Sequence, residues 1–305
     1  MKKRIISFLS LFLLATLIHA QPIITETKLL YPSGTSIVKN IENGNSTYAY
    51  GSYNIGKELS GAIQKIYRTY FSVDLSTIPT NATIQEVKVN YSTDYKSYTF
   101  KLTNISSLGS GLGANWAAIG SGSTLHSGIG YGGGTIISTP VKNQIQSALS
   151  SRSMMIGGVG ENETANDSYA YLSINLEVRY TRPATSLNFI AQNYMDGGNS
   201  GNIGVGINTS TITSRTSPFS FSIYEDQTMY FQAYDNQSYN NYNWVFNDSE
   251  APLNPSEWQM NYFSRITNIG QSSSASRPAL TSESGATFQA VLRKICNLTF
   301  SSAGG

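Results

Sequence analysis

Short segments in which apolar and polar residues alternate recur along the whole chain, and clusters of Gly, Asn, Ser and Pro separate them. A period of two is the pattern of a strand with one buried and one wet face. In the clearest case, Ile174, Leu176, Val178 and Tyr180 would share the buried face. In the first half the pattern predicts strands at Ile23–Tyr31, Ile63–Val73, Ile84–Tyr91, Tyr98–Leu102 and Ser173–Tyr180.

The second half repeats the pattern, so we predict an all-β fold of two β-sandwich domains, the first jelly-roll-like and the second immunoglobulin-like. A Pro-containing segment predicts a linker at 182–186, between domains at 21–181 and 187–296. Trp244 is flanked by strand residues and should pack in the second core. The strands expected in this domain are Gly201–Ile207, Phe219–Tyr224, Thr228–Tyr234, Tyr242–Phe246, Trp258–Phe263 and Thr287–Lys294.

One short helix is expected at Pro140–Leu149, because Val141, Ile145 and Leu149 recur at helical spacing behind Thr139, which could cap the helix. The stretch 109–134 is glycine-rich and predicts a flexible surface loop. The alternative is a binding loop that carries an exposed aromatic residue.

The last residues, 297–305, repeat a pattern found at the start of the second domain. In both places an apolar segment with Asn and Phe leads to a Gly-Gly pair, at Gly197-Gly198 and Gly304-Gly305. This echo predicts the start of a further repeat, and with it a chain that is a piece of a longer surface protein.

Residues 1–20 have the pattern of a secretory signal peptide. Lys2, Lys3 and Arg4 precede an apolar stretch from Ile5 to Ile18, and Ala20 supplies the small residue before the cut. The apolar stretch is shorter than a membrane span needs, and no second one follows. We therefore expect a protein that is secreted or held at the cell surface, and that does not span a membrane.

Composition narrows the function classes. Charged residues make up 12% of the chain, against roughly 25% in an average globular protein. The net charge of +2 arises from the three basic residues of the leader, without which 17 basic residues face 18 acidic ones. No basic patch remains that would indicate a nucleic-acid partner. With one Cys in the chain and His126 alone outside the leader, an internal disulfide, Cys-pair metal or redox motifs and a His-rich metal site are excluded.

Four stretches of the first half, taken in order, resemble the DNRLRE-type domain, a jelly-roll-like β-sandwich. They are the strand Arg68–Ser76, the turn Ile78–Ile84, the helix around Val141–Leu149 and the closing strand Leu176–Tyr180. Leu149 or Ala148 stands where that family commonly has a Trp. The resemblance covers most of residues 22–181. It implies a secreted or wall-associated β-sandwich, and a related family of carbohydrate-binding modules suggests sugar binding.

The second half is similar to the immunoglobulin-like or PEGA-like repeats of bacterial surface proteins. The residues that carry this likeness are Gly204-Val205-Gly206, Ser217-Pro218-Phe219 and the strand Met229–Tyr234. The resemblance implies a spacer or repeat unit that presents the first domain.

Sugar recognition uses aromatic ring faces together with amide and hydroxyl groups, and the chain is rich in both. The alternative is that this composition keeps an exported β-protein soluble without charges. The candidate glycan-binding residues are Tyr48, Tyr50, Tyr53, Trp116 and Tyr131.

Hard oxygen ligands gather in the segment 157–168, where Glu161, Glu163 and Asp167 could hold a structural Ca²⁺ ion. The spacing does not match a known calcium loop, so a solvated turn is the alternative. No other metal or cofactor is indicated.

The chain shows no nucleophile elbow, phosphate-binding loop or marked carboxylate pair. We therefore expect a non-catalytic polysaccharide-binding or adhesion module followed by a spacer. Two alternatives stay open: the N-terminal part of a larger secreted enzyme or toxin-like surface protein, and a small polysaccharide lyase. The lyase would have to recruit Arg68, Lys88, Lys96, Lys101, Tyr67, Tyr70, Tyr91 and Tyr95.

Overall fold

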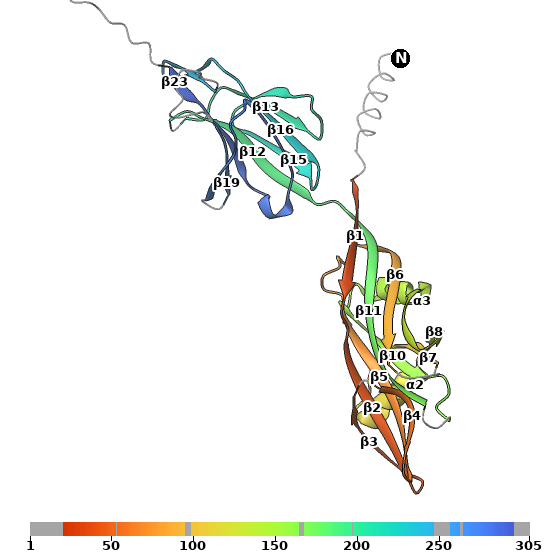
Figure 1. Ribbon diagram of the computed structural model, residues 1–305. Coiled ribbons are helices and arrows are strands. Elements are labelled where there is room, and N and C mark those ends of the chain that lie inside the picture. The colour runs from red at the N-terminus through yellow and green to blue at the C-terminus, as the bar shows by residue number, and fades with distance from the viewer. Residues whose placement is uncertain are drawn as a thin grey trace, which may run out of the picture. The chain divides into compact units, whose positions relative to one another are not determined.

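The computed structural model describes residues 21–52, 54–94, 99–164, 168–196, 198–246, 257–262 and 265–295. The chain divides into two compact units, Ile23–Pro183 and the part that begins at Ala184 (Figure 1). Strands dominate both units, which confirms the predicted all-β, sandwich-type fold. No described helix is long and apolar enough to cross a bilayer. The predicted leader at 1–20 and the predicted repeat start at 297–305 lie outside the described residues.

The first unit is built on an 11-stranded arrangement with the order β8-β7-β10-β5-β4-β11-β6-β9. Strand β1 joins it through β11, β2 joins through β5, and β3 pairs with β2. The elements are β1 (Ile23–Leu30), β2 (Ser33–Glu42), β3 (Asn45–Gly51), β4 (Asn54–Ser60), β5 (Ile63–Asp74), β6 (Thr83–Thr93), β7 (Phe100–Ile105), α2 (Leu112–Ser121), β8 (Thr124–Ile129), β9 (Gly132–Ile137), α3 (Thr139–Ala148), β10 (Ser153–Gly160) and β11 (Ser168–Pro183).

Strand β11 joins the two halves of this arrangement, and Figure 1 shows it running along the unit as one long strand. Its first residues pair with β4, and the rest pairs with β6 and β1. The predicted inward face is confirmed, because Ile174, Leu176, Val178 and Tyr180 are all buried in the core. Strand β5 contributes Phe71 and Val73 to the same core.

Helix α3 confirms the helix predicted from periodicity, and its Val141, Ile145 and Leu149 are buried in the core. Its cap differs from the expectation. The Ser138 hydroxyl, not that of Thr139, accepts the backbone N–H of Val141 at 3.3 Å.

The composition of the glycine-rich stretch 109–134 predicted a loop, and this prediction is wrong. The stretch contains helix α2, strand β8 and the first residues of β9. His126 consequently lies on β8, opposite Leu102 of β7. Strands β2, β3, β4 and β10 were also not predicted, and β10 takes up the start of the loop expected at 157–168.

The second unit has sheets of five, four and three strands, ordered β15-β12-β22-β19-β20, β14-β13-β16-β21 and β17-β18-β23. Its first strand, β12, pairs in parallel with β22 near the end of the unit. The elements are β12 (Ser186–Tyr194), β13 (Asn202–Ile207), β14 (Thr213–Thr216), β15 (Phe219–Tyr224), β16 (Thr228–Ala233), β17 (Gln237–Tyr239), β18 (Tyr242–Val245), β19 (Glu257–Tyr262), β20 (Arg265–Gly270), β21 (Ser274–Pro278), a 3-10 turn (Thr281–Glu283), β22 (Thr287–Val291) and β23 (Arg293–Ile295).

Aromatic rings form the centre of the second core. The ring centroid of Phe231 lies 4.8 Å from that of Phe288 and 5.5 Å from that of Trp258. Trp244 is buried as predicted, but the fully buried Trp258 is the tryptophan that touches the central phenylalanine. The linker expected at 182–186 is short, since β11 ends at Pro183 and β12 begins at Ser186.

Candidate functional site

Strands β3, β2 and β5 bring several of the predicted residues to one sheet face. Directly paired residues of antiparallel strands point to the same side of a sheet. Tyr48 is paired with Lys39, and Tyr50 with Ile37. Ile37 is in turn paired with Arg68 of β5. Tyr48, Tyr50, Lys39 and Arg68 therefore share a face, and the two tyrosines lie on the strand β3.

Helix α2 covers part of this face and places Trp116 against it. The Trp116 ring lies 6.1 Å from the Tyr48 ring, between centroids. Its centroid lies 3.4 Å from the Arg68 guanidinium carbon and 5.0 Å from the Lys39 ammonium nitrogen. Contacts of cations with an indole at such distances are attractive. The indole Nε1–H also donates to the Ile66 carbonyl at 3.3 Å. Trp116 is thus half-buried and anchors the helix, which is different from the exposed loop aromatic that we had considered.

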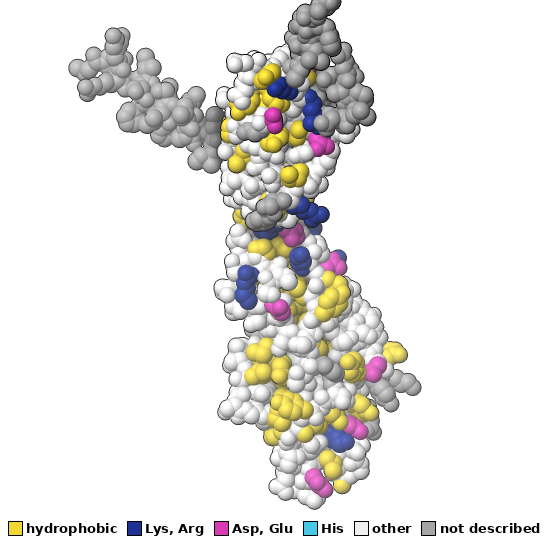
Figure 2. All heavy atoms as spheres, turned by 90° about the vertical axis from the view of Figure 1, so that its left-hand side faces the viewer, with side chains coloured by type: hydrophobic (Ala, Val, Ile, Leu, Met, Phe, Trp, Pro, Cys, Tyr) yellow, Lys and Arg dark blue, Asp and Glu magenta, His cyan; other side chains and the backbone are white. Residues whose placement is uncertain are grey.

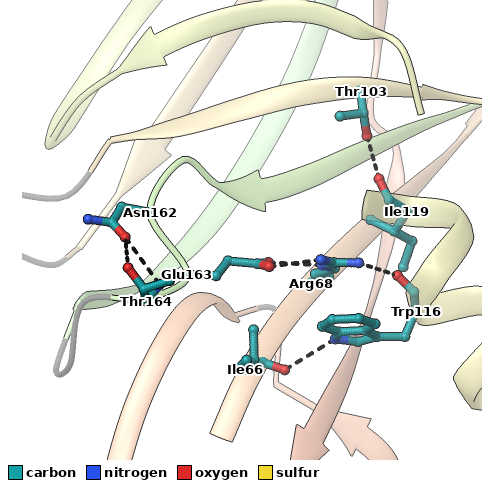
Figure 3. A network of polar contacts seen from close by, with 8 residues as sticks. All are labelled: Ile66, Arg68, Thr103, Trp116, Ile119, Asn162, Glu163 and Thr164. Carbon is teal, nitrogen blue, oxygen red and sulfur yellow. Dashed lines mark hydrogen bonds and ion pairs between the residues drawn. The ribbon is translucent and has the colours of Figure 1, made fainter. Parts of the chain in front are cut away.

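Arg68 is the centre of the polar network drawn in Figure 3. Its Nε and Nη2 each lie 2.8 Å from a carboxylate oxygen of Glu163, and its Nη1 donates to the Trp116 carbonyl at 2.8 Å. The two side chains are 12% and 20% exposed. A two-point guanidinium–carboxylate pair of this kind is strong and fixes direction. The network therefore ties the segment after β10 and helix α2 to strand β5.

Two glycines let helix α2 lie this close to the sheet. A Cβ atom on Gly120 would stand 1.9 Å from Nη1 of Arg68, and one on Gly113 would stand 3.1 Å from the Tyr48 ring. These positions explain part of the glycine-rich composition as close packing rather than as flexibility.

The remaining predicted aromatic residues do not join the cluster. Tyr131 lies in the connection between β8 and β9, is 64% exposed and has no ring contact with another described residue. Tyr53 lies outside the described residues. Tyr50 remains as the open ring of the face, with 71% of the residue exposed.

The described carboxylates of the calcium hypothesis are already in contact with donors. Glu161 accepts the Gly128 backbone N–H at 2.6 Å, and both oxygens of Glu163 face Arg68. Asp167 lies outside the described residues. Within the described ranges no three His, Cys, Asp or Glu side chains lie together as a metal site requires. Calcium binding stays an untested hypothesis that these contacts do not favour.

The residues that a lyase would recruit are divided between surfaces. Arg68 is engaged by Glu163, whereas Lys88 lies on β6, where it pairs with Glu177 at 2.7 Å. Tyr67 precedes Arg68 on β5 and therefore points to the other face. Burial and a hydrogen bond to Glu58 raise the pKa of the Tyr67 phenol.

Other members of the lyase set pack into the unit or lie outside the described residues. Tyr91 packs edge-on against Phe100 with centroids 5.9 Å apart. Tyr70 is half-buried against the hydrophobic cluster beneath α2. Tyr95 and Lys96 lie outside the described residues.

The sequence reasoning missed Lys39 as a member of the candidate face. Lys39 forms no ion pair with a described residue, and it is only half-buried. The signal for it would have been alternation, since it lies two residues after the buried Ile37.

Charges are otherwise sparse on the surface. On the face shown in Figure 2 they are few and scattered among uncharged polar groups.

Comparison with known proteins gives no further assignment, because no family model and no curated protein matches the chain.

Proposed function

We propose that this protein is a non-catalytic, secreted or cell-surface protein that binds polysaccharides through its first unit, with the second unit as a spacer. The observation that supports this most directly is the face formed by Tyr50, Tyr48 and Lys39 on strands β2 and β3. It brings together the exposed ring of Tyr50, the ring of Tyr48 two residues before it on the strand, and Lys39, which has no carboxylate partner among the described residues.

The chemistry of this face suits a sugar chain. An aromatic ring offers an apolar surface with a negative π-face, against which the C–H groups of a pyranose ring can pack. The lysine ammonium group offers three hydrogen-bond donors to hydroxyl or carboxylate oxygens of the sugar. The expected DNRLRE-type resemblance and the expected export point the same way.

The test is affinity electrophoresis of the chain from residue 21 in gels that contain neutral or anionic polysaccharides. We expect retardation by at least one polymer, and a three- to tenfold weaker affinity (about 1 kcal/mol) for Tyr50→Ala, from the loss of ring packing. Tyr131→Ala is the matched control, because it removes a similarly exposed ring outside the face.

Lys39→Gln separates two classes of polymer. It should weaken the binding of anionic polymers more than that of neutral ones, since it removes a charge but keeps hydrogen-bonding capacity. The proposed function would be overturned if no polymer retarded the protein, or if Tyr50→Ala and Tyr131→Ala lowered the affinity for the polymer equally.

A further inference from the structure

A cleft of about 520 Å³ lies beside helix α3, where the start of β10 meets β5 and the end of β7. Its volume falls within the range of small-molecule sites, roughly 300–1,000 Å³. Along β5 the side chains of Ile66, Arg68, Tyr70 and Ser72 share one face by alternation. Ser72 at the cleft lies about 20 Å along the strand from Ile66, the residue paired with Lys39. The cleft therefore lies on the same side of the sheet as the Tyr48–Tyr50 face but further along β5, since Tyr50 is level with Arg68, four residues before Ser72.

The lining of the cleft is polar but uncharged. Five serine hydroxyls and two carboxamides surround a floor of aliphatic and thioether groups. Arg152, which is adjacent in sequence, donates to the Ile78 carbonyl and does not line the cleft. The lining residues are Ser72, Asn104, Ile105, Ser106, Gln144, Ser147, Ala148, Ser151, Ser153, Met154 and Met155.

Gln144 supplies a fixed acceptor at this cleft. Its Nε2 donates to Oδ1 of Asn104 and, at 3.2 Å, to the carbonyl of Met155. Because the Met155 carbonyl can only accept, a flipped Gln144 amide would set oxygen against oxygen, so the orientation is determined. The Oε1 atom is buried and accepts no hydrogen bond from a described residue. A buried acceptor without a donor is costly, and a hydroxyl group at the cleft would satisfy it after a small shift of the side chains that cover the oxygen.

Several hydroxyls at the rim are also available. Those of Ser72, Ser106 and Ser153 form no hydrogen bond to a described residue, whereas the Ser147 hydroxyl donates to the Asn143 carbonyl at 2.9 Å and can still accept. The lining thus offers donors, acceptors and an apolar floor, and no charge.

We propose that this cleft binds one neutral sugar residue, with Gln144 Oε1 and the serine hydroxyls bonded to the sugar hydroxyls and Met155 and Ile105 packed against its C–H groups. An anionic sugar or a phosphate would lose hydration without gaining a cation, which is unfavourable. The proposal deepens the proposed function, on which it rests for the class of ligand, and adds a site that does not use Tyr50.

The experiment uses the chain from residue 21 labelled with [¹³C-methyl]methionine. Two methionines line the cleft, Met154 and Met155, and the remaining ones after the leader, Met195, Met229 and Met260, belong to the second unit and serve as internal controls. The probes are the methyl glycosides of glucose, galactose and mannose, with sodium glucuronate as the anionic comparison. Each is added to about 50 mM, because small sugars bind in the millimolar range.

We expect at least one neutral glycoside to shift the Met154 or Met155 signal and glucuronate to shift neither. Ser72→Tyr, which fills the cleft from an exposed strand position, should weaken this binding at least tenfold. Ser92→Tyr places the same side chain at an exposed position of β6 and should leave the binding unchanged.

The cleft proposal would be overturned if no neutral glycoside shifted the Met154 or Met155 signal, or if glucuronate shifted it equally. It would also be overturned if Ser92→Tyr weakened the binding as much as Ser72→Tyr does. Tyr50→Ala distinguishes it from the proposed function. This variant should keep the methionine shifts while it weakens the retardation by polymers. Methionine shifts without any polymer retardation would remove the proposed function and leave the sugar site standing.

Discussion

Arg68 and Glu163, 95 residues apart in the chain, meet in a two-point ion pair with both nitrogen–oxygen distances at 2.8 Å. The guanidinium is at the same time stacked on the Trp116 ring. One arginine thus holds helix α2 and the segment after β10 against strand β5. Both side chains are largely withdrawn from water, so the pair is worth more than a typical surface ion pair.

Glu163→Gln should lower the free energy of unfolding of the first unit by about 1–3 kcal/mol, because it leaves the Arg68 charge without its counter-charge. Urea unfolding measures the change, and hydrogen exchange of the α2 amides localises it. Glu177→Gln is the control. It breaks the Lys88–Glu177 pair, whose side chains are 35% and 36% exposed, and should leave stability nearly unchanged. Equal effects of the two substitutions would contradict the role given to Arg68.

Gly120→Ala tests the close contact of α2 with Arg68. The added methyl group would stand 1.9 Å from Nη1 of an arginine that is held on three sides. We expect a destabilisation of about 1–3 kcal/mol, the usual range for overpacking.

The same substitution should change sign when Arg68 is absent. In the Arg68→Ala background, Gly120→Ala should be neutral or should stabilise by about 0.5–1 kcal/mol, which is the helix preference of Ala over Gly. The double-mutant cycle measures this coupling. Additive effects in the cycle would show that Gly120 is required for some other reason.

Local pattern was sufficient to predict the part of β11 from Ser173 to Tyr180 and the helix α3. Both display their period in a few consecutive residues, and the core buries the residues that the period selects. Helix α2 could not be predicted in this way, because glycine lowers helix propensity. It forms where Trp116 and Ile119 pack on the sheet and where Gly113 and Gly120 permit the approach. Tertiary contact here overrides composition.

The candidate site was predictable only in part for the same reason. Tyr48 and Tyr50 are two residues apart, so a strand places them on one face. Their relation to Lys39 and Arg68 depends on the register of β3, β2 and β5, which no local pattern contains. The cleft beside α3 joins residues of four elements that are scattered over more than eighty positions, and serines carry no signal by themselves.

Removal of Ca²⁺ should not affect the first unit. Glu163 is bonded to Arg68 and Glu161 to the Gly128 N–H, so a calcium ion would have to displace both contacts. We therefore expect the same Tm in excess EDTA and in millimolar CaCl₂. A rise in Tm with CaCl₂ that is lost in Asp167→Asn would restore the calcium hypothesis, because ligand binding to the folded state raises stability.

Tyr180 should make the first unit sensitive to alkali. Burial, followed by its hydrogen bond to Glu26 at 2.8 Å, raises the pKa of the phenol from 10.0 to about 12. In the folded state the proton is thus held at pH values at which the unfolded chain has released it. The contribution of Tyr180 to the free energy of unfolding is therefore fully present below pH 10 and is lost as the pH rises toward 12. The slope is at most about 1.4 kcal/mol per pH unit for one such proton.

Tyr180→Phe isolates this contribution. The variant loses the hydrogen bond to Glu26 and should be less stable at pH 8, but its stability should fall less steeply between pH 10 and 12. Tyr67, whose pKa is also raised by burial and by Glu58, keeps part of the slope. Tyr131→Phe, at an exposed position, should follow the unsubstituted protein. Urea midpoints measured from pH 8 to 12 decide the matter, and an unchanged alkaline slope in Tyr180→Phe would show that this buried phenol does not control the transition.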